Sequence, residues 1–113
     1  MEIRTRRERH YAVAAPRGRI DAVTAGEFET AIRELIGKTG CKVLIMNFGD
    51  LEYISSAGLR AILAVAKVLK AGNGSLVFAS LKDTVLNVFK ISGFESMFAI
   101  YPNEDAAIQK AEG

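Results

Sequence analysis

The sequence has few of the residues that build disulfides and metal sites. Its 113 residues include one cysteine, Cys41, and one histidine, His10. A single cysteine excludes a disulfide within the chain, and neither a C-x-x-C nor an H-E-x-x-H motif occurs. We interpret Cys41 as a small apolar filler and His10 as a turn residue. We therefore expect no metal and no other cofactor.

Long apolar runs are also missing. No run approaches the ~20 residues that a helix needs to cross a bilayer, and the segment Met1–Arg4 lacks the apolar stretch of a signal peptide. Because roughly 100–200 residues is the usual size of a domain, we expect residues 1–113 to form one domain. We expect that domain to be cytoplasmic, without membrane insertion.

The net charge is small. Fifteen basic and thirteen acidic residues give +2, which is too near neutral to predict a dedicated nucleic-acid-binding protein. Residues 1–19 carry six arginines and a net charge of +4, but they lack the interleaved aromatic residues that stack on bases. We interpret these arginines as the solvated faces of two strands, with a patch for an acidic partner or nucleic acid as the alternative.

Apolar periodicity predicts an α/β fold with the element order β-β-α-β-α-β-α-β-α. The segment Lys42–Phe48 is a continuous apolar run, typical of a strand buried on both faces. Strands alternating with helices imply a mostly parallel sheet, to which an N-terminal hairpin adds an antiparallel pair. We expect about five strands, at residues 1–6, 11–20, 42–48, 76–79 and 98–100, and about four helices, beginning near residues 21–24, 56, 83–84 and 104.

Glycine, proline and short polar residues predict the boundaries of these elements. Pro16 and Gly18 interrupt the second strand, which indicates an edge position or a bulge. Asp21 or Thr24 can cap the first helix, and Gly37 or Gly40 can end it. Residues 49–54 are expected to be a connection without regular structure.

The segment Leu51–Leu59 is the candidate functional site, because it follows a buried strand and opens an amphipathic helix. In open α/β sheets, ligands and partners bind beyond the carboxyl ends of the strands. Ser55 and Ser56 lie at the start of the helix, beside its unpaired N–H groups and positive dipole end. The simplest interpretation is that one of them is an ordinary N-cap. Gly58 costs roughly 1 kcal/mol against alanine inside a helix, which indicates close approach by another backbone or by a partner.

In this segment the chain resembles the STAS family of anti-sigma factor antagonists, whose signature is Asp-Ser-Ser/Thr-Gly-Leu or a variant. Ser55-Ser56-Ala57-Gly58-Leu59 stands in its place, with Ser55 where many members have Asp and Ala57 where they have Ser or Thr. The turn Gly18-Arg19-Ile20-Asp21 and the segment Ile91-Ser92-Gly93-Phe94 also resemble the family. The resemblance covers nearly the whole chain and implies a single STAS-type domain.

The resemblance implies a phosphorylation switch. In such proteins the unphosphorylated form binds an anti-sigma factor, often itself a serine kinase, and thereby releases the sigma factor. The kinase phosphorylates the second residue of the signature and a phosphatase reverses the step. The implied phosphoacceptor is Ser56, with Ser55 as the alternative, and the implied partner-binding residues are Asp21, Tyr53, Ser55, Ser56, Ala57, Gly58, Leu59 and Arg60.

Other functions stay open. One is a STAS accessory subunit of a transporter or lipid-trafficking complex, in which Ser56 is never phosphorylated. Another is a module that binds a nucleotide or other anion at the helix start formed by residues 55–59. No phosphate-binding loop and no credible catalytic set occur, so we do not expect an enzyme. Asp21, Asp50 and Glu52 are expected to lie near Ser56 and to repel a phosphate there.

Overall fold

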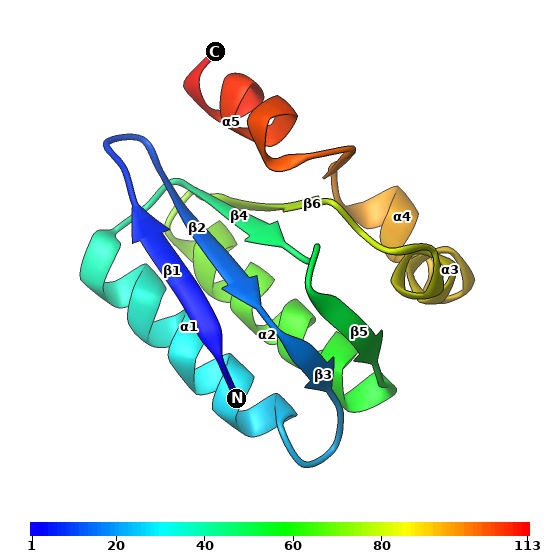
Figure 1. The fold of residues 1–113 in the computed structure, drawn as a ribbon. Helices are drawn as coiled ribbons and strands as arrows, with labels where there is room; N and C mark the ends of the chain where they lie inside the picture. The colour runs from blue at the N-terminus through cyan, green and yellow to red at the C-terminus, as the bar shows by residue number, and fades with distance from the viewer.

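The computed structural model describes all residues, 1–113, and its main feature is a five-stranded sheet in the order β1-β2-β4-β6-β7 (Figure 1). β1 (Ile3–Arg7) pairs antiparallel with β2 (Tyr11–Pro16). β4 (Val43–Asn47), β6 (Ser75–Ala79) and β7 (Ile100–Tyr101) continue the sheet in parallel. The predicted α/β fold, with an antiparallel hairpin on a mostly parallel sheet, is confirmed.

Two short strands form a second sheet that the sequence pattern did not predict. β3 (Gly18–Ile20) pairs in parallel with β5 (Leu51–Ile54). The expected single strand over 11–20 is therefore wrong, because the chain leaves the main sheet after Pro16 and Gly18 adopts φ +93° beside a register shift. The expected connection over 49–54 is also wrong. In β5 the two end residues are buried and the two middle residues are exposed, so no alternating pattern marks it as a strand.

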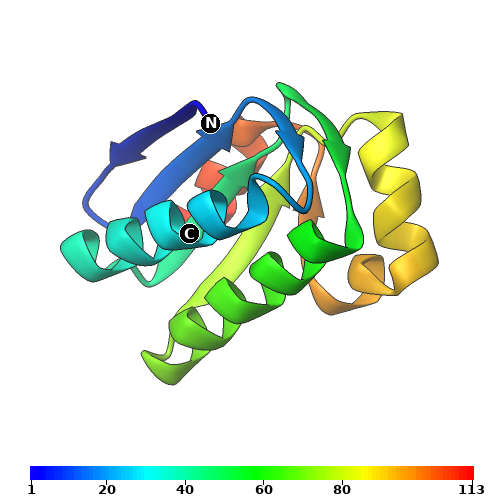
Figure 2. The same ribbon diagram turned by 90° about the horizontal axis from the view of Figure 1, so that it is seen from below.

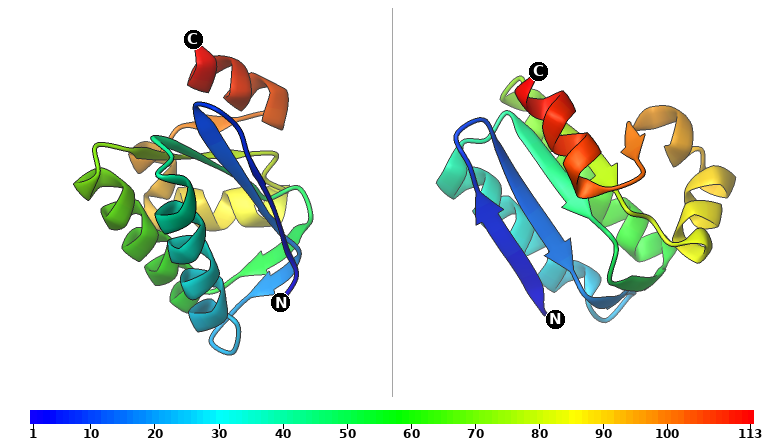
Figure 3. Two further views of the ribbon diagram at one scale, coloured as in Figure 1. Left: turned by 90° about the vertical axis from the view of Figure 1, so that its left-hand side faces the viewer. Right: turned by 45° about the horizontal axis from the view of Figure 1, so that its top comes forward.

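Three helices cover one face of the main sheet and a fourth covers the other (Figure 3). α1 (Ala25–Thr39), α2 (Ser56–Ala71) and α3 (Asp83–Ser92) lie on one side, and α5 (Glu104–Glu112) lies on the opposite side. α1 continues through Gly37 and ends at Gly40, which takes the left-handed conformation with φ +59°. No helix is both long and apolar enough to span a membrane.

The helix count differs from the prediction by one short helix. α4 (Phe94–Met97) follows α3 directly and displaces the last strand to 100–101 from the expected 98–100. Phe94 of α4 is buried, with its ring 5.5 Å from the rings of both Phe89 and Phe98. One turn of helix is too short to produce a periodic apolar pattern, so packing rather than local pattern determines α4.

The core lies on both faces of the main sheet. Twenty buried residues form the larger cluster, on the side of α1, α2 and α3. Five residues form the smaller cluster, in which Tyr11, Val13 and Ile45 pack against Ala107 of α5. Leu44 and Met46 of β4 belong to the larger cluster and Ile45 to the smaller. This alternation confirms that the apolar run is a central strand buried on both faces.

Gly58 brings the first turn of α2 against the ends of β3 and β5. A Cβ atom at this position would lie 2.6 Å from Cγ1 of Ile54 and 2.9 Å from Cγ2 of Ile20, and 3.0 Å from the carbonyl oxygen of Ile20. Any side chain would therefore push the helix away from the strand ends. The close backbone approach that the sequence indicated is confirmed, and this contact positions the serines described below.

We predict that Gly58→Ala lowers the free energy of unfolding by about 1–3 kcal/mol, the usual range for overpacking. The matched control is Gly26→Ala in α1, where a Cβ would meet nothing within 4 Å. Alanine is the better helix former, so this control should be neutral or stabilising by up to about 1 kcal/mol. Urea denaturation of both variants is the measurement. Equal changes in the free energy of unfolding would show that the close contact at Gly58 does not exclude a side chain.

Candidate functional site

The ends of β3 and β5 bring together two segments that are far apart in the sequence. The strands are parallel and Ile20 pairs with Ile54, so the residues that follow them leave at the same edge (Figure 1). The backbone N–H of Ser55 donates a hydrogen bond of 2.9 Å to the carbonyl oxygen of Ile20. Asp21 and the two serines therefore occupy one end of the small sheet, as expected for the carboxyl ends of strands.

The two serines have different roles in the helix start. Ser55 is the N-cap of α2 and half-buried, and its Oγ accepts a long hydrogen bond of 3.4 Å from the Gly58 N–H. Ser56 is the first residue of the helix and is exposed. The N-cap interpretation is therefore confirmed for Ser55. Ser56 is left as the accessible hydroxyl beside the positive end of the helix dipole.

The carboxylate of Asp21 accepts hydrogen bonds from its own loop, and Asp21 is not the N-cap residue of α1. Its Oδ1 accepts hydrogen bonds from the N–H groups of Val23 at 3.0 Å and Thr24 at 3.2 Å. These hydrogen bonds lower the pKa of Asp21, and the bond from Thr24 has the largest effect. The guanidinium of Arg19, with Nε 3.6 Å from Oδ2 of Asp21, acts in the same direction. Thr24 is the N-cap residue of α1 but makes no side-chain capping bond.

The sequence analysis missed two site residues, Arg19 and Val23, which contact Tyr53 and Asp21. The guanidinium of Arg19 lies over the ring of Tyr53, with Cζ 4.3 Å from the ring centroid, an arrangement that stabilises both side chains in place. Val23 is 90% exposed, so its branched apolar side chain is open to a partner. Val23 falls in a loop without periodicity, so its exposure had no signal in the sequence.

The remaining residues of the predicted partner surface divide into exposed and packed ones. Tyr53 and Arg60 are exposed, the former to 41%. Ala57 and Leu59 are half-buried and pack against the larger core cluster. Gly58 is buried, so it positions the helix and offers little surface to a partner.

The expected acidic surroundings of Ser56 are only partly present. Asp50 precedes β5, at the end of the strand away from Ser55, and pairs with Arg4 at 3.2 Å. The expectation that Asp50 lies near the serines is therefore wrong. Glu52 lies on β5 but pairs with Lys82 at 2.7 Å. Asp21 is thus the carboxylate that lies at the same strand edge as the serines.

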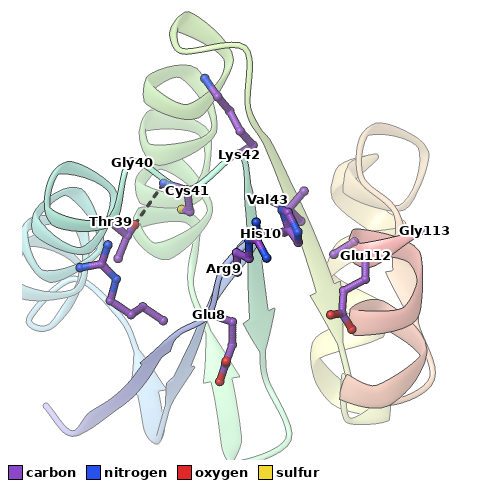
Figure 4. Close-up of a pocket in the computed structure, with 12 residues that line it drawn as sticks. Glu8, Arg9, His10, Thr39, Gly40, Cys41, Lys42, Val43, Glu112 and Gly113 are labelled. Atoms are coloured by element: carbon purple, nitrogen blue, oxygen red, sulfur yellow. Dashed lines mark hydrogen bonds between the residues drawn. The ribbon is translucent and has the colours of Figure 1, made fainter.

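The main cavities lie away from the two serines. None of the five is lined by Ser55 or Ser56. The largest, about 760 Å³, lies beyond the amino ends of β2 and β4, between the β1–β2 turn and the ends of α1 and α5 (Figure 4). Cys41 and His10 line this cavity with Arg9 and Lys42, and no group of three potential metal ligands occurs in the structure. The helix start at Ser56 is an open surface, suited to a protein partner more than to an enclosed small ligand.

The lowered pKa of Asp21 predicts a pH dependence of stability. The folded state favours the carboxylate, so Asp21 contributes stability that is complete above its ordinary pKa of 3.8 and is lost as the pH falls through the lower folded value. We expect the difference in unfolding free energy between wild type and Asp21→Asn to shrink on acidification. Urea denaturation over a pH series is the measurement, with Glu34→Gln, an exposed carboxylate on α1, as the control. A difference that is independent of pH would contradict this assignment.

A family model and a curated relative match most of this chain. Residues 2–107 match the model of the STAS domain. A Bordetella bronchiseptica protein that carries the name anti-sigma factor antagonist BtrV is 39% identical over 95 residues, which cover 84% of this chain and 81% of BtrV.

Solved structures match the fold over almost the full length. SpoIIAA, an anti-sigma factor antagonist, superposes in its unphosphorylated form with a TM-score of 0.86 at 23% identity, covering 99% of this chain and 97% of SpoIIAA. The phosphorylated form of Bacillus SpoIIAA gives a TM-score of 0.74 at 22% identity, covering 96% of this chain and 98% of that one. At these identities the likeness concerns the fold. Together with the family model and BtrV, it confirms the resemblance seen in the signature segment, and the chain belongs to the STAS domain family.

Proposed function

We propose that this chain is an anti-sigma factor antagonist whose binding to an anti-sigma factor is switched off by phosphorylation of Ser56. The observation that carries the proposal is the exposed hydroxyl of Ser56 at the first position of α2, in the signature segment of the family. The name carried by BtrV and by SpoIIAA supports the same function. The role is one of binding, and it places the chain in the cytoplasm, where transcription takes place.

The geometry favours Ser56 over Ser55 as the phosphoacceptor. Ser55 is half-buried and engaged with the N–H of Gly58, whereas Ser56 is exposed. A phosphate adds about −1.5 to −2 charge at pH 7, and the N–H groups and dipole at a helix start tolerate that charge. The fold therefore persists after modification. The existence of solved structures of SpoIIAA in both forms agrees with a switch of this kind.

The same phosphate disrupts a docked partner. A surface that packs against a neutral Ser56 would have to desolvate a dianion, and an unpaired buried charge costs several kcal/mol. Each 1.4 kcal/mol is about tenfold in affinity, so phosphorylation reduces binding by orders of magnitude without unfolding the protein. Asp21 adds repulsion to the phosphate, while Arg60, one turn further along α2, offsets part of it.

The partner surface that we propose consists of the exposed and half-buried residues around Ser56. Val23 and Tyr53 supply apolar area, and Asp21, Arg19 and Arg60 supply charge. We further propose that the anti-sigma factor is itself the serine kinase and that a phosphatase restores the binding form. The accessory-subunit alternative predicts instead a transporter or lipid-trafficking component in a pull-down, and no modification of Ser56.

We predict that Ser56→Ala abolishes phosphorylation by the cognate anti-sigma kinase and ATP. Ser55→Ala is the matched control: it removes the N-cap and costs about 1 kcal/mol of stability but leaves the acceptor hydroxyl. Intact-protein mass spectrometry with site mapping is the measurement. Full modification of Ser56→Ala would overturn the assignment of the acceptor, since the phosphate would then lie elsewhere.

We predict that Val23→Asp weakens binding to the anti-sigma factor at least about tenfold, because the new carboxylate would be buried in the interface without a partner. Gln109→Asp introduces the same charge at an exposed position on α5, on the opposite face of the main sheet, and should leave the affinity unchanged. Titration calorimetry gives both values. Because Val23 is 90% exposed, its replacement leaves the core intact. Equal affinities of Val23→Asp and wild type would exclude this loop from the interface.

A further inference from the structure

The outer face of α2 carries two grooves that meet the proposed partner surface only at Arg60. The first, about 440 Å³, runs along α2 above β6 and α4, and the second, about 570 Å³, runs between α2 and α1. Leu63 and Lys67 line both grooves, so the two grooves form one continuous surface. Figure 2 shows α2 lying between α1 on one side and the α3–α4 pair on the other. We call the lining of both grooves the α2 surface.

The charges of the α2 surface have one sign. Arg33, Arg60, Lys67 and Lys70 line the grooves, and no aspartate or glutamate does, although the chain has thirteen acidic residues. α2 itself contains no acidic residue. Arg33 is paired with Glu29 at 2.9 Å, while the three cations of α2 take part in none of the ion pairs of the structure. The surface therefore attracts a partner of negative charge.

The three cations of α2 follow a helical stripe with an apolar centre. Arg60, Leu63, Lys67 and Lys70 are spaced by three, four and three residues, which places them along one face of the helix over about 15 Å. Leu63, Ala66 and Val68 are half-buried, and Met97 of α4 is 58% exposed at the groove rim. An apolar groove bordered by regularly spaced charges is the arrangement that receives an amphipathic helix.

We propose that the α2 surface docks an acidic amphipathic helix of a partner protein. Apolar side chains of that helix, at spacing i, i+3, i+4 and i+7, would occupy the two grooves, and its carboxylates would face Arg60, Lys67 and Lys70. The concave shape favours a helix over a lipid surface, which an amphipathic element meets with a protruding apolar face. The proposal does not require that the partner be an anti-sigma factor or that Ser56 be phosphorylated.

The experiment uses the full chain, labelled with ¹⁵N, and two synthetic peptides of sixteen residues, the length of α2. Both peptides carry leucine at the i, i+3, i+4 and i+7 positions. One has glutamate and the other lysine on its remaining face. We expect the glutamate peptide alone to shift the amide resonances of the residues that line the α2 surface, with an affinity that falls as salt screens the charges. Equal shifts with both peptides, or none with either, would overturn the proposal.

Charge reversal gives the decisive comparison. The double variant Lys67→Glu, Lys70→Glu should bind the glutamate peptide at least about tenfold more weakly than the wild type does. It should also gain binding of the lysine peptide, because rim charges determine partner choice. Lys38→Glu with Lys90→Glu makes the same charge change at exposed positions outside the grooves and should leave binding unchanged. Circular dichroism establishes that both double variants are folded.

Two further measurements exclude other occupants. If phosphatidylglycerol vesicles bind the wild type more tightly than the glutamate peptide does, and the Lys67→Glu, Lys70→Glu variant loses that binding, the occupant is a membrane and the proposal fails. If sedimentation shows a wild-type dimer that this variant dissociates, the occupant is a second copy of the chain and the proposal fails equally. Neither measurement depends on Ser56, so failure here leaves the proposed phosphorylation switch intact.

Discussion

The parallel pairing of β3 with β5 is the constraint on which the candidate site depends. It brings Ile20 beside Ile54 and so places the loop of Asp21 next to the start of α2, more than thirty residues later in the chain. The helix start is held there by the hydrogen bond from Ser55 to Ile20 and by the close fit of Gly58 against both isoleucines. With any larger residue at 58, the serines would move away from the strand edge.

The charges around Ser56 are largely satisfied before any modification. Asp21 accepts hydrogen bonds from its own loop and lies beside Arg19, and Glu52 is paired with Lys82. A phosphate on Ser56 would therefore enter a surface whose neighbouring cations are already engaged, Arg60 excepted. It would meet the helix N–H groups on the protein side, whereas a docked partner would have to desolvate it. This asymmetry explains why a fold can tolerate the charge while an interface does not.

α2 connects the partner surface around Ser56 with the α2 surface. Its first turn carries Ser56, and its outer face continues from Arg60 to Lys70 without an acidic residue. The inner face, with Ile62, Val65 and Leu69, is buried in the larger core cluster. One helix thus provides core packing on one side and two distinct surfaces, an N-terminal and a lateral one, on the other. Arg60 belongs to both, because it lies one turn after Ser56 and also lines the lateral groove, whereas Lys67 and Lys70 belong to the lateral surface alone.

Local patterns in the sequence determined the strands of the main sheet and four of the five helices, because apolar runs and helical periodicity report burial directly. They also placed the two serines at a strand-to-helix junction. Gly58 likewise indicated a close backbone approach. Only the tertiary structure decided that Ser55 caps the helix while Ser56 stays exposed, that Asp50 lies away from the serines, and that Val23 and Arg19 border the site. These features follow from the pairing of two strands of three and four residues. Strands so short contain no apolar periodicity that the sequence could show. Their ends are buried by packing against the first turn of α2.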